Sequence, residues 1–186
     1  MFQVRIHGRG GQGVVTGAEL LSVAAFIEGK HAQAFPSFGS ERMGAPVISY
    51  CRMDEREIRL REPIEAPDAL IIQDPTLLHS VDVFKGLNPE GYILINSRRS
   101  FEELGIATFV ARFPAHHVCD VGATELARKH VGRPVPNAAL LGGFAAISGQ
   151  IRFRSVAQAI REKFPGPVGE ANVAAAEEAF EIASHA

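Results

Sequence analysis

A glycine-rich turn near the start of the sequence, between a strand-like stretch and a helix-like one, is the feature that most limits the fold. Residues 2–7 alternate apolar and polar side chains, as a half-buried strand does, and residues 14–28 form an apolar-rich helical stretch. The six residues between them are Gly8, Arg9, Gly10, Gly11, Gln12 and Gly13. Three of the glycines fit the pattern G-x-G-x-x-G in the strand-to-helix context that the pattern requires. We therefore predict a tight turn whose backbone N–H groups can hold a phosphate, a pyrophosphate or a carboxylate.

A nicotinamide or flavin dinucleotide site is the first interpretation of such a turn, but one of its parts is missing. Dinucleotide sites usually place an acidic residue about 20 residues further on, at the end of the second strand, where it binds the ribose. The second strand expected here, His31–Phe35, contains no acid, and Glu28 comes too early. Two other interpretations stay open, namely a turn that binds a different phosphate and a turn built only for strand-to-helix packing.

Length and composition are those of one ordinary globular domain, expected to span residues 1–186. Hydrophobic residues make up 46% of the chain and charged residues 22%. A net charge of -2 favours neither nucleic acid nor an anionic membrane as a partner. Apolar runs are too short to span a membrane, and because residue 1 leads directly into the first strand we expect no signal peptide. We therefore expect a cytoplasmic location.

The remaining pattern predicts strands alternating with helices, followed by a helical C-terminal third. We expect an antiparallel hairpin formed by residues 47–53 and 57–61. Further strands are expected at 69–74, 92–96 and 107–113. A short helix is expected directly after the strand at 69–74, capped by Asp74 and running to Phe84. Helices are expected at 120–131, 138–149 with Asn137 as cap, 155–164 and 169–183. The predicted fold is a single Rossmann-like α/β domain with a mainly parallel sheet.

Catalytic and metal-binding motifs are absent from the sequence. It contains no Gly-x-Ser-x-Gly, no His-Glu-x-x-His and no Walker lysine after the glycines. The two cysteines, Cys51 and Cys119, are far apart and cannot by themselves hold a four-cysteine cluster or zinc site. We therefore assign no catalytic residue and no metal ligand to this chain.

A turn-rich loop after the second strand carries side chains that are unusual for a mere connection. Residues 35–46 contain two prolines and two glycines, together with Phe35, Phe38, Glu41 and Arg42. Aromatic and arginine side chains in a loop favour a binding site or a partner surface. The alternative is that the two phenylalanines pack in the core and that Glu41 and Arg42 form a solvated ion pair.

Taken together, these segments resemble the gamma subunit of 2-oxoacid:ferredoxin oxidoreductases, the pyruvate synthase group. The resemblance rests on residues 6–13, on residues 33–47 with their Phe-Pro-Ser-Phe-Gly-Ser-Glu-Arg run, and on residues 72–78 with their Gln-Asp-Pro-Thr run. Residues 137–142 are similar to a late helix start of the same family. Met43 departs from the family, in which Arg or Gly is common at that place.

The resemblance implies a subunit of an enzyme that oxidatively decarboxylates a 2-oxoacid, forms acyl-coenzyme A and reduces ferredoxin. It implies alpha, beta and delta-type partner subunits, which carry thiamine diphosphate and the [4Fe-4S] clusters. It also implies that the glycine turn binds a phosphate of coenzyme A or makes an assembly contact, with Arg9 and Gln12 reaching the phosphate. It leaves open whether the 2-oxoacid is pyruvate, a branched-chain acid, 2-oxoglutarate, oxalate or an aryl glyoxylate, and whether electrons end on ferredoxin or NAD. A purely structural scaffold subunit and a free-standing dinucleotide-dependent oxidoreductase remain the alternatives.

Overall fold

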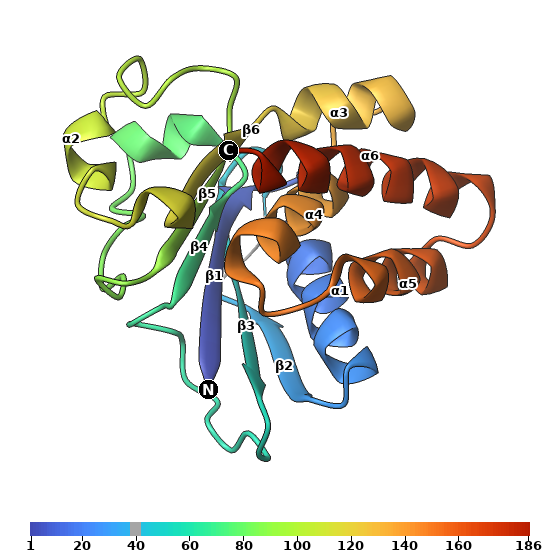
Figure 1. Cartoon of the computed structure of the whole chain (residues 1–186). Coiled ribbons are helices and arrows are strands. Elements are labelled where there is room, and N and C mark those ends of the chain that lie inside the picture. Colours follow the sequence, from blue (N-terminus) through green and yellow to red (C-terminus); the bar gives the residue numbers. More distant parts are fainter. Residues whose placement is uncertain (38–41) are drawn as a thin grey trace.

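A computed structural model describes residues 1–37 and 42–186, and in this part of the chain six strands form one sheet (Figure 1). Their order across the sheet is β2-β3-β1-β4-β5-β6. The strands are β1 (Phe2–Arg9), β2 (His31–Pro36), β3 (Pro46–Asp54), β4 (Ala69–Ile72), β5 (Tyr92–Asn96) and β6 (Val118–Val121). The predicted α/β class with a mainly parallel sheet is confirmed.

The antiparallel part of the sheet differs from the predicted hairpin. β1, β4, β5 and β6 are parallel to one another, whereas β3 runs antiparallel to both of its neighbours, β1 and β2. The hairpin partner of β3 is therefore β2, and the prediction of a strand at 57–61 was wrong. Because β3 already pairs along both of its edges, it has no free edge for a third partner.

The helices divide unequally between the two faces of the sheet. α1, α4, α5 and α6 cover one face, and α2 lies on the other (Figure 1). The α-helices are α1 (Val14–Ile27), α2 (Ala107–Val110), α3 (Ala123–His130), α4 (Asn137–Ser148), α5 (Phe153–Lys163) and α6 (Pro167–Ser184), and the 3-10 helices are η1 (Pro75–His79) and η2 (Ala115–His117). No helix in the described ranges combines the length and the apolar character that are needed to cross a membrane.

The main core lies between the sheet and the covering helices, and α4 and α6 pack most closely within it. Val4, Ile6 and Cys51 face this core from the sheet, and Phe144 of α4 is fully buried. Gly142 of α4 lies directly against the backbone of Ala176, so that a Cβ at this position would overlap the Ala176 carbonyl group. The glycine at this position thus allows the close contact between α4 and α6.

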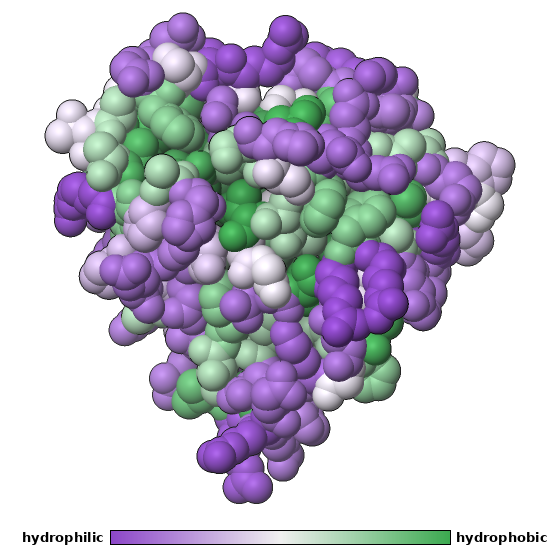
Figure 2. Space-filling view, viewed as in Figure 1, coloured by the Kyte–Doolittle hydropathy of each residue, from purple (hydrophilic) through white to green (hydrophobic). Residues whose placement is uncertain are grey.

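A second, smaller core lies on the opposite face, where the structure corrects another prediction. Residues 107–113 do not form a strand, because α2 begins at Ala107. The apolar residues of this segment recur at helical spacing and face the second core. Ile106, Val110 and Phe113 are buried together with Ile93 of β5 in this second core. The sixth strand is instead β6, a four-residue strand that the sequence pattern missed, and the following helix begins at residue 123 rather than 120. Figure 2 shows hydrophobic residues gathered over this part of the surface, near α2.

The half of that opposite face formed by β1 and β3 is polar. Arg5 and His7 are buried there, and Arg5 Nε donates to His7 Nε2 over 3.0 Å. The remaining Arg5 N–H groups donate to the carbonyl oxygens of Ile64, Val83 and Lys85. Burial lowers the pKa of His7 to about 3, with a further contribution from the neighbouring charge of Arg5. His7 is therefore a neutral acceptor that holds a buried guanidinium in place.

Candidate functional site

The glycine turn lies where a ligand is expected to bind in a sheet of this type. β1 and β4 are parallel neighbours, and the chain leaves β1 toward one edge of the sheet and returns through β4 toward the other. Ligands of open α/β sheets bind at the carboxyl ends of the strands at such a switch point. The turn Gly8–Gly13 begins in the last two residues of β1 at this point, and Gln73 and Asp74 follow β4 beside it. The structure thus brings together two segments that are 60 residues apart in the sequence.

The backbone of the turn needs glycine at two of its positions. Gly11 has φ of 92° and Gly13 has φ of 72°, in the left-handed region that other residues rarely adopt. Gly13 is also the N-cap of α1, and a Cβ there would collide with the side-chain amide of Asn137. The predicted tight strand-to-helix turn is therefore present, and its glycines are required by conformation and by close packing.

Arg9 and Gln12 hold the turn to the end of β4 through Asp74. Arg9 Nε lies 3.3 Å from Asp74 Oδ2, and its Nε and Nη2 groups donate to Thr76 Oγ1 over 3.2 and 3.0 Å. Gln12 Nε2 donates to Asp74 Oδ2 over 2.8 Å, while Gln12 Oε1 accepts from the backbone N–H of Arg9 over 2.8 Å. The two side chains that we expected to reach a phosphate are thus engaged with the protein itself.

Asp74 is the common acceptor of this network and also begins η1. Its Oδ1 accepts from the backbone N–H of Thr76 over 2.9 Å, which confirms the predicted cap, although the helix ends at His79 rather than Phe84. Partial burial by itself would raise the pKa of Asp74. Hydrogen bonds from Thr76 and Gln12, together with the positive charge of Arg9, outweigh it and hold the pKa below its usual value. Asp74 is therefore ionised at neutral pH.

A second segment, residues 42–45, is joined to the turn by backbone hydrogen bonds. Gly10 donates to the carbonyl oxygen of Ala45 over 2.9 Å and accepts from the N–H of Gly44 over 3.1 Å. Arg9 Nη1 also donates to the carbonyl oxygen of Gly44, and a Cβ on Gly10 would collide with the Arg42 carbonyl. Met43 lies over Gly11 and is 86% exposed. The glycine turn and the segment directly before β3 are therefore joined to each other.

The N-terminus of α1 leaves backbone donors without protein partners. The N–H groups of Gly11, Gly13, Val15 and Thr16 donate to no residue within the ranges 1–37 and 42–186. The first turn of α1 contains no acidic residue, and no side chain caps it. Because the positive end of a 14-residue helix points to the same place, the arrangement favours an anionic group as the ligand.

Several amide side chains that we did not single out as site residues form hydrogen bonds with the turn or with the residues that contact it. Gln73 Nε2 donates to the carbonyl oxygen of Gln12 over 2.9 Å, and Asn96 Nδ2 donates to that of Gln73 over 2.8 Å. Asn137 Nδ2 donates to the carbonyl oxygen of Gly13 over 3.2 Å. Asn137 is the first residue of α4 and not its cap, which is Pro136. Polar residues directly after apolar strands, as at 73–74 and 96–97, were the available signal in the sequence.

The residues of the predicted partner loop are only partly brought together. Phe38 and Glu41 lie outside the described residues. Phe35 belongs to β2, where its ring packs at 5.0 Å from that of Tyr50 and Arg52 lies 5.5 Å above it. Arg42 is exposed. Phe35 is therefore a half-buried strand residue, and only Arg42 of the described pair is available on the surface.

Comparisons with known proteins agree with this architecture. A model of the pyruvate ferredoxin/flavodoxin oxidoreductase family matches residues 3–182. The chain is 46% identical to a Pyrococcus abyssi protein named pyruvate/ketoisovalerate oxidoreductases common subunit gamma, over 97% of this chain and 96% of that one. It is 44% identical to pyruvate synthase subunit PorC of Methanocaldococcus jannaschii, with the same coverage. The crystal structure of the pyruvate oxidoreductase subunit PORC of Thermotoga maritima superposes with a TM-score of 0.81 at 32% identity, covering 97% of this chain and 96% of the other.

Proposed function

The chain belongs to the pyruvate ferredoxin/flavodoxin oxidoreductase family, and we propose that its glycine turn binds a phosphate group of coenzyme A. In this proposal the chain is the gamma-type subunit of a complex that oxidatively decarboxylates a 2-oxoacid, transfers the acyl group to coenzyme A and passes two electrons to ferredoxin. Relatives named for pyruvate and for ketoisovalerate support a substrate of this class. The proposed partners are alpha, beta and delta-type subunits of the same complex.

The side chains of this chain do not fit an iron–sulfur cluster. Cys51 and Cys119 are both buried, and burial raises the pKa of their thiols to about 12 and about 11. Within the described ranges, no three His, Cys, Asp or Glu side chains come together as a set of metal ligands. In this proposal, partner subunits therefore hold the clusters and thiamine diphosphate, and this chain contributes to substrate binding and assembly.

The donors at the start of α1 are the observation that carries the coenzyme A proposal. Coenzyme A presents a pyrophosphate and a 3′-phosphate, which need N–H donors and a positive potential. The N–H groups of Gly11, Gly13, Val15 and Thr16 supply the donors, and the helix supplies the potential. Arg9 and Gln12 keep the turn in shape through Asp74. Any other residue at Gly11 would strain the backbone and place a Cβ against Met43.

The proposal is tested by steady-state kinetics of the assembled complex carrying Gly11→Ala. We expect the Michaelis constant for coenzyme A to rise about 10- to 100-fold, as for a lost charge-assisted contact of roughly 1.5–3 kcal/mol, with the constant for the 2-oxoacid unchanged. Gly105→Ala is the matched control, because Gly105 has φ of 77° with no atom near its Cβ position and lies between Leu104 and Ile106 of the second core, outside the turn. It produces the same backbone strain without changing the site.

Comparison with dephospho-coenzyme A distinguishes the two kinds of phosphate. If Gly11→Ala raises the Michaelis constant for coenzyme A but not that for dephospho-coenzyme A, the turn binds the 3′-phosphate. If it raises both constants equally, the turn binds the pyrophosphate. If Gly11→Ala leaves the coenzyme A constant unchanged in an intact complex, the turn serves packing alone and the scaffold alternative holds. Binding of a nicotinamide or flavin dinucleotide by the chain would instead favour the free-standing oxidoreductase.

A subunit contact through Arg42 and the neighbouring Phe38 and Glu41 is the second part of the proposal. Arg42 is exposed, and its backbone is fixed beside the turn through the contacts of Gly10 with residues 42–45. Arginine is enriched at buried interface centres, where its truncation commonly costs about 2 kcal/mol or more. Arg42→Ala is expected to weaken assembly while the melting temperature of the chain stays unchanged.

A further inference from the structure

The outer edge of β2 carries backbone groups without partners. Ser37 donates to the carbonyl oxygen of Ile48 over 2.8 Å, which sets the alternation of hydrogen-bonded pairs along β2 and β3. Gln33 and Phe35 therefore direct their N–H and C=O groups toward β3, whereas Ala32 and Ala34 direct theirs outward. No described residue pairs with these outward groups of Ala32 or Ala34. β2 is thus an edge strand that is open over its central part.

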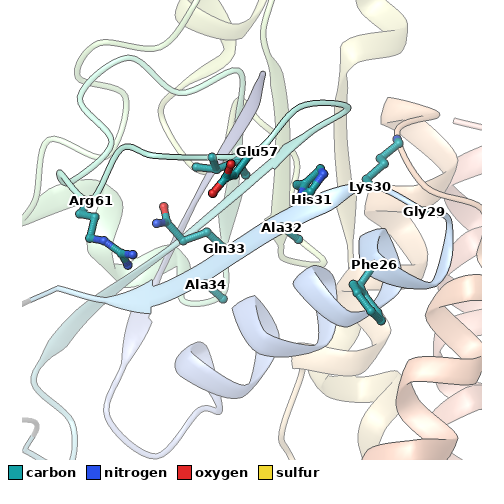
Figure 3. Close-up of a pocket in the computed structure, with 10 residues that line it drawn as sticks. Phe26, Gly29, Lys30, His31, Ala32, Gln33, Ala34, Glu57 and Arg61 are labelled. Atoms are coloured by element: carbon teal, nitrogen blue, oxygen red, sulfur yellow. The ribbon is translucent and has the colours of Figure 1, made fainter.

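A groove of about 670 Å³ runs along this edge (Figure 3). Ala32 and Ala34 point toward α1, while His31 and Gln33 point to the opposite side, where Glu57 and Arg61 lie on the segment that follows β3. At the α1 end of the groove stands Phe26, which is 74% exposed. The groove therefore offers backbone donors and acceptors along its length and an apolar contact at one end.

The charge of the groove is predominantly positive. Lys30, His31 and Arg61 line it, and none of the three lies within 4 Å of a carboxylate in the described part of the chain. The one acidic residue of the groove, Glu57, is 3.7 Å from Arg59, which lies outside it. Lys30 Nζ donates to the main-chain carbonyl oxygen of Gln150 over 2.5 Å, away from the centre of the groove. Arg61 is therefore the cation of the groove that no described residue of this protein pairs with.

We propose that the β2 edge binds an extended, acidic segment of another subunit of the complex, which adds to the sheet as a further strand. The outward groups of Ala32 and Ala34 pair with its backbone, a carboxylate lies against Arg61, and an apolar side chain packs on Phe26. Strand addition of this kind takes its affinity from the main chain and its specificity from alternate side chains. The inference rests on the proposed membership of a complex, and it is independent of coenzyme A binding.

Two features of the edge limit the occupant. Pro36 has no N–H, so the added strand is restricted to the stretch beside residues 31–35. A second copy of this chain, paired through its own β2, would bring a second set of the same cations to the groove. Charge complementarity therefore favours a partner that supplies carboxylates over self-association.

Amide hydrogen exchange, measured residue by residue on the free full chain and on the assembled complex, tests the proposal. We expect the amides of Ala32 and Ala34 to exchange at least about tenfold more slowly in the complex, whereas those of Gln33 and Phe35 are slow in both states. Equal rates for Ala32 and Ala34 in the two states would overturn the proposal while leaving subunit membership intact. Protection that grows with the concentration of the free chain would assign the edge to self-pairing and would also overturn it. A chain that does not assemble with the other subunits would contradict the proposed function itself.

Two variant pairs test the backbone and the charge separately. Ala34→Pro removes only an outward N–H group and should weaken assembly about 2- to 12-fold, as for one lost hydrogen bond, whereas the control Ala34→Ser keeps the N–H group. Arg61→Glu should slow association, with a smaller effect at high salt. Its control is Arg56→Glu, which makes the same charge change at an exposed position on the same segment, outside the groove. Equal effects of Arg61→Glu and Arg56→Glu would contradict the assigned acidic partner.

Discussion

Arg9 and Asp74 form an ion pair between the turn after β1 and the residue after β4, with 3.3 Å between Nε and Oδ2. The pair joins two segments that flank the switch point of the sheet, and Gln12 and Thr76 complete it with hydrogen bonds to the same carboxylate. An aspartate that only capped η1 would not need these partners. Asp74 therefore determines the shape of the glycine turn as well as the start of a helix.

Asp74→Asn is expected to destabilise the chain by about 1–2 kcal/mol at pH 7, because charge-assisted hydrogen bonds become neutral ones. The folded pKa of Asp74 lies below its unfolded value, so its contribution is present above the unfolded pKa of about 3.9 and is lost as the pH falls through the folded pKa. Urea unfolding at a series of pH values measures both effects. The variant should lose less stability below pH 4 than the wild type does.

His7→Gln is expected to flatten the dependence of stability on pH between 7 and 5. The folded pKa of His7 is about 3 and the unfolded value about 6.5, so the unfolded chain binds a proton in this window that the folded chain does not. Stability is therefore complete above about 6.5 and falls as the pH drops toward 3. From pH 7 to pH 5 this site alone removes about 2 kcal/mol of unfolding free energy. Glutamine keeps an acceptor for Arg5 and does not titrate.

The measurement for His7 is the difference in unfolding free energy between the two pH values. His185→Gln, near the exposed C-terminus, is the control and should retain the full pH dependence. If His7→Gln loses as much stability between pH 7 and 5 as His185→Gln does, His7 is protonated in the folded chain and its assigned role as a neutral acceptor is wrong.

Gly142→Ala and Gly143→Ala are expected to have opposite effects, although the two positions are adjacent in α4. The Cβ of the first would overlap the backbone of Ala176, which cannot rotate away, and overpacking of this kind costs about 1–3 kcal/mol. The Cβ of the second would lie 3.4 Å from the side chain of Leu94, near ordinary contact. Alanine is also favoured over glycine in a helix by up to about 1 kcal/mol. Thermal unfolding of the two variants should therefore show a loss for Gly142→Ala alone.

The elements with strong local signals were predicted well. The first strand, the glycine turn and α1 follow one another as expected, because alternation, left-handed glycines and an apolar helical run are properties of neighbouring residues. The same holds for β4, β5 and α6. Elements whose signal is short or ambiguous were not predicted, as with β6, which has four residues, and with residues 107–113. In that segment, apolar residues at 106, 110 and 113 fit a helix, while other apolar residues fit the alternation of a strand. Only burial of the first set in the second core distinguishes the helix from the strand.

Local sequence patterns did not predict which strands pair with each other or which side chains contact the site residues. The sequence by itself determined a glycine-rich turn before a helix, an α/β sheet and the family resemblance, because each depends on residue types at fixed short spacings. Only the tertiary structure decided that β3 pairs with β2, that Arg9 and Gln12 bind Asp74, and that Asn137 closes the turn from 124 residues away. These contacts join distant segments through packing and hydrogen-bond geometry, and no local spacing in the chain encodes which segments will meet.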